Sequence, residues 1–111
     1  MEIKTVHLKR CDLVELSGRF DSNTAPELDV ALRASMDQDI HRIVLDMGGV
    51  EYFGSAAIRS LVVAYKECRR WNRGDVRLAN VPDRVRHVLD LAGLWQVVQC
   101  FENSALAVGS F

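Results

Sequence analysis

A short apolar run followed by a helix start constrains this chain more than any other feature. Residues 43–47 read Ile-Val-Leu-Asp-Met, a pattern typical of a strand buried on both faces of a sheet. The Gly48–Gly49 pair that follows indicates a turn, and apolar residues at helical spacing begin near Ser55. The sequence therefore predicts a lone hydroxyl at the mouth of a helix, just past the end of a central strand.

The residues before this strand predict a β-hairpin and a crossover helix. Residues 2–10 and 13–17 carry apolar side chains at strand-like spacing and are separated by a short reversal. Thr24 and Glu27 have the spacing of a capping box, and the helix that they begin extends to about Asp37. A strand, a helix and a strand in this order favour a right-handed βαβ unit with parallel strands.

Beyond Ser55 the chain continues to alternate between helix and strand. The patterns predict a helix over residues 55–70, a strand over 76–79 and a helix from Pro82 that Gly93 closes as a C-terminal cap. A strand over 97–101 and a short last helix over 102–108, with Asn103 or Ser104 as its N-cap, are expected to follow. We therefore expect one α/β domain in the order β-β-α-β-α-β-α-β-α. Its sheet is mixed but mostly parallel, and about four helices pack on it.

Composition agrees with one soluble domain and argues against several classes of function. The 111 residues are 49% hydrophobic and 26% charged, and a formal net charge of −1 gives no general attraction to nucleic acid. No apolar run reaches the roughly 20 residues of a membrane span, and the N-terminus lacks the core of a signal peptide. Three widely spaced cysteines indicate neither a disulfide framework nor a metal knuckle, so we expect a cytoplasmic protein.

No group of side chains has the spacing that catalysis or metal binding needs. The histidines are scattered, Ser55 lies outside any Gly-x-Ser-x-Gly elbow, and the glycines do not form a phosphate-binding loop. We therefore expect no enzymatic activity, no metal and no cofactor. The cysteines are expected to be buried or incidental thiols: Cys11, Cys68 and Cys100.

Ser55 has two possible roles at its predicted position. As a structural residue, a serine at a helix start is a favoured N-cap, which contributes about 1 kcal/mol. As a functional residue, it stands where free backbone amides and the positive end of the helix dipole best tolerate a phosphate. Arg59, one helical turn further on, is either a partner for that phosphate or an ordinary solvated arginine. The two roles of Ser55 are compatible, because a phosphorylated cap can keep the helix while changing its surface.

Asp21 lies between the second strand and the first helix. The carboxyl ends of parallel strands share one edge of a sheet, so we expect Asp21 and Ser55 to lie near each other. The alternative is a local role, in which Asp21 forms an Asx-turn or helps to cap the helix that begins near Thr24.

Several segments of the chain resemble the STAS domain, and in particular the free-standing anti-sigma-factor antagonists of bacteria. They cover nearly the whole length in the family's order: Leu16–Asp21, Thr24–Leu28, Ile43–Asp46, the segment around Ser55, and Val88–Leu94. The resemblance implies a STAS fold for residues 1–111 as a single domain.

The family's switch motif reads Asp-Ser-(Ser/Thr)-Gly-(Leu/Ile), and this chain has Gly54-Ser55-Ala56-Ala57-Ile58. The serine that family members have phosphorylated falls on Ser55. The glycine of the motif is replaced by Ala57, which suits the first turn of a helix. The acidic residue is replaced by Gly54, which removes a carboxylate that a kinase or partner could recognise. The same change removes like-charge repulsion against a phosphate.

The resemblance implies an anti-sigma-factor antagonist that binds an anti-sigma factor with serine kinase activity. Phosphorylation of Ser55 would switch it off, and a serine phosphatase would reset it. The residues that this implies for partner binding are Asp21, Ser22, Asn23, Thr24, Gly54, Ser55, Ala56 and Arg59. We expect a monomer or a weak homodimer.

Two other functions compete with this one. The first is a STAS subunit that is never phosphorylated and serves as a scaffold in a signalling or lipid-transport complex, which Gly54 favours. The second is a nucleotide-binding domain or small α/β enzyme, which the lack of a phosphate-binding loop and of an acid–base set disfavours.

Overall fold

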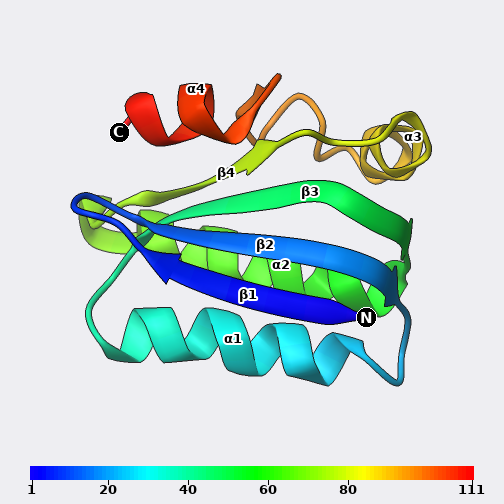
Figure 1. Ribbon diagram of the computed structural model, residues 1–111, viewed down its shortest axis with the longest axis horizontal. Coiled ribbons are helices and arrows are strands. Elements are labelled where there is room, and N and C mark those ends of the chain that lie inside the picture. Colours follow the sequence, from blue (N-terminus) through cyan, green and yellow to red (C-terminus); the bar gives the residue numbers. More distant parts are fainter.

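A computed structural model describes all residues, Met1–Phe111, and shows a single sheet with helices packed on it (Figure 1). The strands are β1 (Glu2–His7), β2 (Asp12–Phe20), β3 (Arg42–Phe53), β4 (Asp75–Ala79) and β5 (Cys100–Phe101). The helices are α1 (Ala25–Asp37), α2 (Ser55–Arg69), α3 (Asp83–Leu91) and α4 (Ser104–Gly109), with a short 3-10 turn at Arg70–Asn72. This is the predicted order of elements.

The strands lie across the sheet in their sequence order, β1-β2-β3-β4-β5. The hairpin strands β1 and β2 pair antiparallel, and β2–β3, β3–β4 and β4–β5 all pair parallel. The predicted mixed, mostly parallel sheet is therefore confirmed. None of the helices is both long and apolar enough to cross a membrane.

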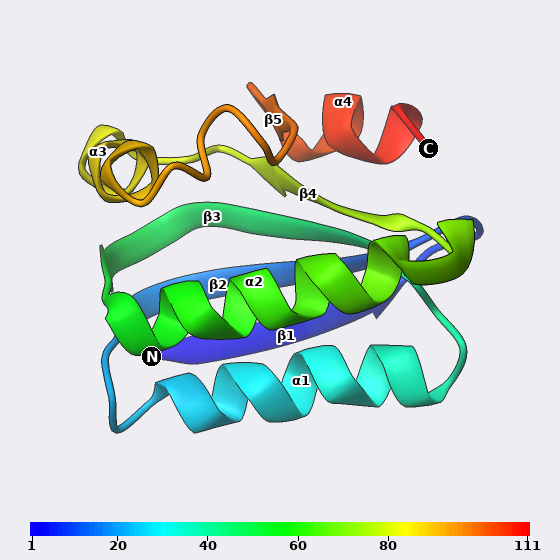
Figure 2. The same ribbon diagram turned by 180° about the vertical axis from the view of Figure 1, so that it is seen from behind.

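Most of the helical mass covers one face of the sheet. Helices α1 and α2 run side by side across that face, which Figure 2 shows from behind. They and α3 contribute to a core of 21 buried residues, to which the middle of β3 adds Ile43, Leu45 and Met47. The alternate residue Val44 points to the opposite face, where it packs with Cys11, Ala79 and Ala107 of α4. Both faces of β3 are thus buried near its start, as its apolar run predicts.

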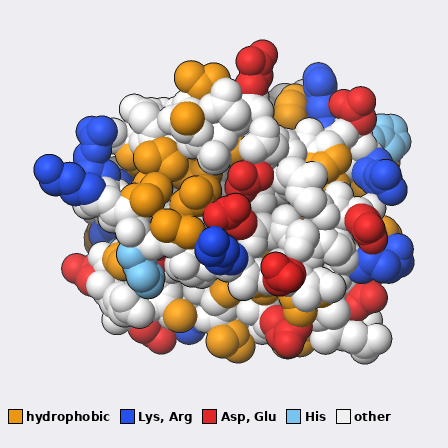
Figure 3. Space-filling view, viewed as in Figure 1, with side chains coloured by type: hydrophobic (Ala, Val, Ile, Leu, Met, Phe, Trp, Pro, Cys, Tyr) orange, Lys and Arg blue, Asp and Glu red, His pale blue; other side chains and the backbone are white.

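The face opposite α1 and α2 is left partly open. Figure 3 shows hydrophobic side chains gathered on it beside α4, with acidic and basic side chains further along. The partly buried residues that pack against the α4 cluster are Leu13, Phe101, Val108 and Phe111.

The predicted turn at Gly48–Gly49 is wrong, because β3 continues through it to Phe53. The pairing of β2 with β3 shifts register there, so that β3 bulges between its contacts with Glu15 and Ser17 of β2. A Cβ atom on Gly49 would lie 2.7 Å from the Ser17 Cβ. Gly49 thus permits a close approach of two strands, and pairing across the sheet overrides the local turn signal.

The last predicted strand is shorter than expected. Only Cys100 and Phe101 of the predicted residues 97–101 form β5, whereas the residues before them are turn and coil. The predicted caps of the neighbouring helices are confirmed. Gly93 has a positive φ of 76° just after α3, and the Asn103 side chain accepts a hydrogen bond from the Leu106 amide at the start of α4.

Replacing Gly49 by alanine tests the role of the bulge. We expect Gly49→Ala to lower the free energy of unfolding by about 1–3 kcal/mol, because the new methyl group would overlap Ser17. Gly109→Ala is the matched control, since a Cβ there has no neighbour within 4 Å. Urea denaturation would measure both. Equal stability of the two variants would show that the bulge does not need glycine.

Candidate functional site

The ends of β2 and β3 bring two loops of the chain together. Phe20 pairs with Phe53 in register, and the Gly54 amide donates a hydrogen bond of 2.9 Å to the Phe20 carbonyl. Both rings are buried, with centroids 6.2 Å apart. The turn that follows Phe20 therefore lies beside the start of α2, as the parallel arrangement of the strands predicts.

Ser55 is the first residue of α2, and Gly54 before it is the N-cap. The capping role that the structural interpretation assigned to Ser55 is thus wrong. The serine is exposed, and its hydroxyl has no hydrogen-bond partner within the chain. The first bond of the helix runs from the Ile58 amide to the Gly54 carbonyl at 3.0 Å. The amides before Ile58 have no acceptor inside the helix, so a free hydroxyl stands beside free donors.

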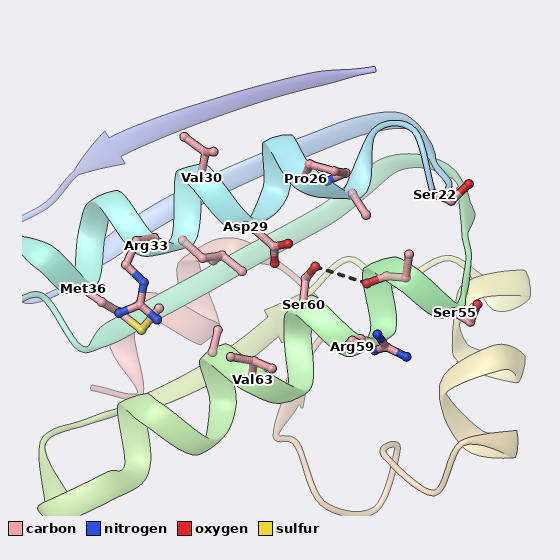
Figure 4. A pocket seen from close by; sticks show the side chains of 14 residues that line it. Ser22, Pro26, Asp29, Val30, Arg33, Met36, Ser55, Arg59, Ser60 and Val63 are labelled. Atoms are coloured by element: carbon pink, nitrogen blue, oxygen red, sulfur yellow. Dashed lines mark hydrogen bonds between the residues drawn. The ribbon is translucent and has the colours of Figure 1, made fainter.

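A groove of about 660 Å³ between α1 and α2 opens beside Ser55. Figure 4 shows its walls, with Ser22, Pro26, Asp29 and Val30 on the α1 side and Ser55, Arg59 and Val63 on the α2 side. Val30 and Val63 are large apolar residues, yet they are 70% and 51% exposed. A partner docked at Ser55 would find apolar surface along this groove.

Two arginines of the groove differ in their bonding. Arg33 joins the two helices by a bidentate ion pair with Glu67, with N–O distances of 2.6 and 3.0 Å. Arg59 is exposed and has no carboxylate within ion-pair distance. Its guanidinium is therefore free to meet an anion at the Ser55 end of the groove.

Asp21 organises the turn that leads into α1. Its Oδ1 accepts hydrogen bonds from the amides of Asn23 (2.9 Å) and Thr24 (3.2 Å), so it forms the local turn given above as the alternative. These hydrogen bonds hold the pKa of Asp21 below its ordinary value of 3.8. The bond from the Asn23 amide has the largest effect, and those from the Thr24 amide and hydroxyl have smaller ones. Asp21 remains charged throughout the physiological range.

The predicted capping box of Thr24 and Glu27 is wrong. Thr24 is the N-cap of α1, but its side chain does not cap a helical amide. Its Oγ1 donates to the Arg19 carbonyl at 2.8 Å and accepts from the Asp21 amide at 3.0 Å. The hydroxyl is used to close the turn between β2 and α1, so it is unavailable to the helix.

Gly54 lies beneath an aromatic side chain. A Cβ atom built on Gly54 would lie 2.9 Å from both Cε2 and Oη of Tyr52. The Arg19 guanidinium in turn covers the Tyr52 ring, 4.6 Å from its centroid. The space that an acidic side chain at position 54 would enter is thus occupied by Tyr52.

The structure places the predicted binding residues in two adjacent groups. Ser22, Ser55, Ala56 and Arg59 line the groove. Asp21, Asn23, Thr24 and Gly54 form the neighbouring turn and helix cap without lining it. Sequence reasoning missed the α1 wall of the groove and the Arg19–Tyr52 pair. The sequence positions of Val30 and Val63 could have indicated the groove, because these two apolar residues lie outside the buried stripes of their helices.

The cysteine side chains are not suited to chemistry at neutral pH. Cys11 and Cys68 are buried, and burial raises the pKa of Cys68 to about 12. Burial likewise raises the pKa of the half-buried Cys100 thiol to about 11. No three His, Cys, Asp or Glu side chains are grouped so that they could hold a metal ion.

A sequence model of the STAS domain matches residues 2–107, almost the whole chain. The chain belongs to the STAS-domain family. BtrV of Bordetella bronchiseptica, named among the anti-sigma factor antagonists, is 28% identical over 96 residues, which cover 86% of this chain and 82% of BtrV.

Solved structures support the same fold for this STAS domain. A crystal structure of an anti-sigma factor antagonist from Mycobacterium paratuberculosis has a TM-score of 0.88 at 21% identity, and the match covers 98% of this chain and 92% of that one. The phosphorylated form of Bacillus SpoIIAA has a TM-score of 0.77 at 14% identity, with 98% of each chain covered. At these identities the similarity establishes the fold.

The cap geometry of this STAS domain makes opposite predictions for two residues at helix starts. We expect Ser55→Ala to change the free energy of unfolding by less than about 0.5 kcal/mol, because the Ser55 hydroxyl bonds nothing. Asn103→Ala is the comparison, since Asn103 accepts a cap bond of 2.9 Å from Leu106 and its loss costs about 1 kcal/mol. Thermal or urea unfolding distinguishes them. A larger loss for Ser55→Ala would contradict the assignment of the cap to Gly54.

The lowered pKa of Asp21 predicts a dependence of stability on pH. Because this pKa is lower in the folded than in the unfolded chain, the stabilisation is complete above the ordinary value of 3.8 and is lost as pH falls through the folded value. The difference in free energy of unfolding between wild type and Asp21→Ala should therefore be constant near neutral pH and should become smaller as the pH falls into the acid range. Urea denaturation across this pH range measures it. If this difference did not change with pH, the Asp21 charge would not stabilise the turn.

Proposed function

We propose that this STAS domain is an anti-sigma factor antagonist whose docking is switched off by phosphorylation of Ser55. The observation that supports this most is the free, exposed Ser55 hydroxyl at the mouth of α2, next to a groove with exposed apolar walls. The similar proteins named above as anti-sigma factor antagonists favour the same role. It is a binding role in the cytoplasm rather than a catalytic one.

A phosphate at Ser55 would change the docking surface while leaving the fold intact. It adds close to two negative charges at a position where free amides and the helix dipole accept them. Arg59, one turn along α2, is free to pair with it. A partner that fits the neutral surface then meets added bulk and charge, and a loss of about 2 kcal/mol weakens binding roughly thirtyfold.

The switch needs enzymes that the chain itself does not provide. A serine kinase, which is the anti-sigma factor itself in this proposal, would transfer the γ-phosphoryl group of ATP to the Ser55 oxygen and release ADP. The hydroxyl proton would pass to a base of the kinase. A serine phosphatase would remove the phosphate. That SpoIIAA has been solved in a phosphorylated form supports such chemistry on this fold.

Mass spectrometry tests the covalent step. The chain should gain one phosphate on Ser55 when it is incubated with ATP and its cognate anti-sigma factor kinase. Ser55→Ala should gain none, and Ser22→Ala, which changes the exposed serine across the groove, should be modified like wild type. Modification at Ser22 alone, or at neither serine, would overturn the proposed switch.

Affinity separates the switch from the scaffold alternative, which the missing acidic residue at Gly54 favours. Ser55→Ala should bind the anti-sigma factor like wild type, because only a hydroxyl is lost. Ser55→Glu should bind several-fold more weakly, since it places a carboxylate at the helix mouth. Calorimetric titration measures both variants. Equal affinity of wild type and both variants would favour an unregulated scaffold.

A further inference from the structure

The Tyr52 side chain fills the space in front of Gly54. Its Cε2 and Oη would both be 2.9 Å from a Cβ at that position, so any side chain at position 54 requires the ring to move. Gly54 has φ of −86° and ψ of −177°, an extended conformation that any residue can adopt. The backbone therefore does not demand glycine at this cap. The tyrosine ring is what uses the space.

Arg19 completes a pair with Tyr52 on the sheet side of Ser55. The two residues are direct partners in the β2–β3 register, and the guanidinium lies 4.6 Å from the ring centroid. Neither residue lines the groove, and the Tyr52 ring lies next to Gly54, the N-cap of α2. Tyr52 is 42% exposed and Arg19 is exposed as well.

The polar groups of this pair are free donors. Neither the Arg19 guanidinium nor the Tyr52 hydroxyl has a hydrogen-bond partner within the chain, and Arg19 has no carboxylate within ion-pair distance. The carboxylate of Asp21 accepts hydrogen bonds from the amides of its own turn, which lower its pKa most, and the charge of Arg19 lowers this pKa to a lesser extent. A guanidinium can only donate, and a phenol hydroxyl donates readily to an anion. Among protein side chains, the anion that accepts from both donors is a carboxylate.

We propose that Arg19 and Tyr52 form a second recognition element of the docking surface, which binds a carboxylate side chain of the anti-sigma factor. This inference rests on the proposed function and extends it to the sheet side of Ser55. The partner then straddles the mouth of α2, with apolar contacts in the groove and an acidic residue on the Arg19–Tyr52 pair. Gly54 leaves open the space in which the tyrosine ring lies.

Titrations with the cognate anti-sigma factor test this element. Tyr52→Phe keeps the ring and removes only the hydroxyl, and Arg19→Gln removes the charge. Each should weaken binding about tenfold, the effect of losing one hydrogen bond to a charged group. Arg10→Gln is the matched control, because Arg10 is an exposed arginine in the turn between β1 and β2, at the other end of the strands. It should leave the affinity unchanged.

Substitutions at Gly54 give the sharpest comparison. Gly54→Asn and Gly54→Asp have the same shape and both displace Tyr52, but only the second adds a negative charge. Both should weaken binding, and Gly54→Asp should weaken it several-fold more because its carboxylate repels that of the partner. Tighter binding by Gly54→Asp would overturn the proposal, since it would mean that the partner recognises an acid at this position.

The outcomes separate this inference from the proposed function. If Tyr52→Phe and Arg19→Gln bind like wild type while Ser55→Glu binds weakly, the carboxylate site is wrong and the switch stands. If the Tyr52 and Arg19 variants bind weakly while Ser55→Ala and Ser55→Glu match wild type, the carboxylate site stands and the switch fails. If the wild-type chain does not bind the anti-sigma factor, both fail.

Discussion

The parallel pairing of β2 with β3 is the interaction on which the candidate site depends. It places Phe20 beside Phe53, and the Gly54 amide donates a hydrogen bond to the Phe20 carbonyl. The turn at Asp21 therefore lies next to the start of α2. The pairing reaches that far because β3 runs through Gly48 and Gly49, with a bulge that the close contact at Ser17 requires. A β3 that ended at Met47 would separate the two loops.

Because the backbone of Gly54 caps α2, the stability of the helix does not depend on the side chain of its first residue, Ser55. The Ile58 amide bonds the Gly54 carbonyl, whereas the Ser55 side chain takes no part in the helix start. A change at Ser55 therefore alters charge and shape at the surface without removing a structural bond. The core under α2, which includes Ala57 and Leu61, lies on the other side of the helix from this change.

Most of the fold could be predicted from the sequence, because apolar periodicity and cap residues act locally. The Pro82 helix, the Gly93 and Asn103 caps and the buried start of β3 follow from such patterns. The failures are places where tertiary contacts override a local signal. Sheet pairing carries β3 through a pair of glycines that reads as a turn, and the Thr24 hydroxyl is diverted from its helix to the Arg19 carbonyl.

The candidate site was predictable only in its centre. The motif around Ser55 and the shared edge of parallel strands place Ser55 near Asp21, and the structure agrees. The groove forms only when α1 packs against α2. The position of the Tyr52 ring next to Gly54 depends on the pairing of two strands that are far apart in the sequence. No periodicity in the sequence encodes either. In the sequence, Gly54 stands where the family has an acidic residue. In the structure, the Tyr52 ring occupies the space that a side chain at position 54 would enter.

The proposed switch requires that a phosphate on Ser55 weakens docking and leaves the fold unchanged. Its most direct test compares unmodified chain with chain in which phosphoserine has been incorporated uniformly at position 55. Titration against the anti-sigma factor and amide NMR spectra of both forms would be measured together. We predict a dissociation constant about thirtyfold higher for the phosphorylated form, with shifted resonances confined to the mouth of α2 and the groove. Equal dissociation constants, or shifts throughout the core, would contradict the claim.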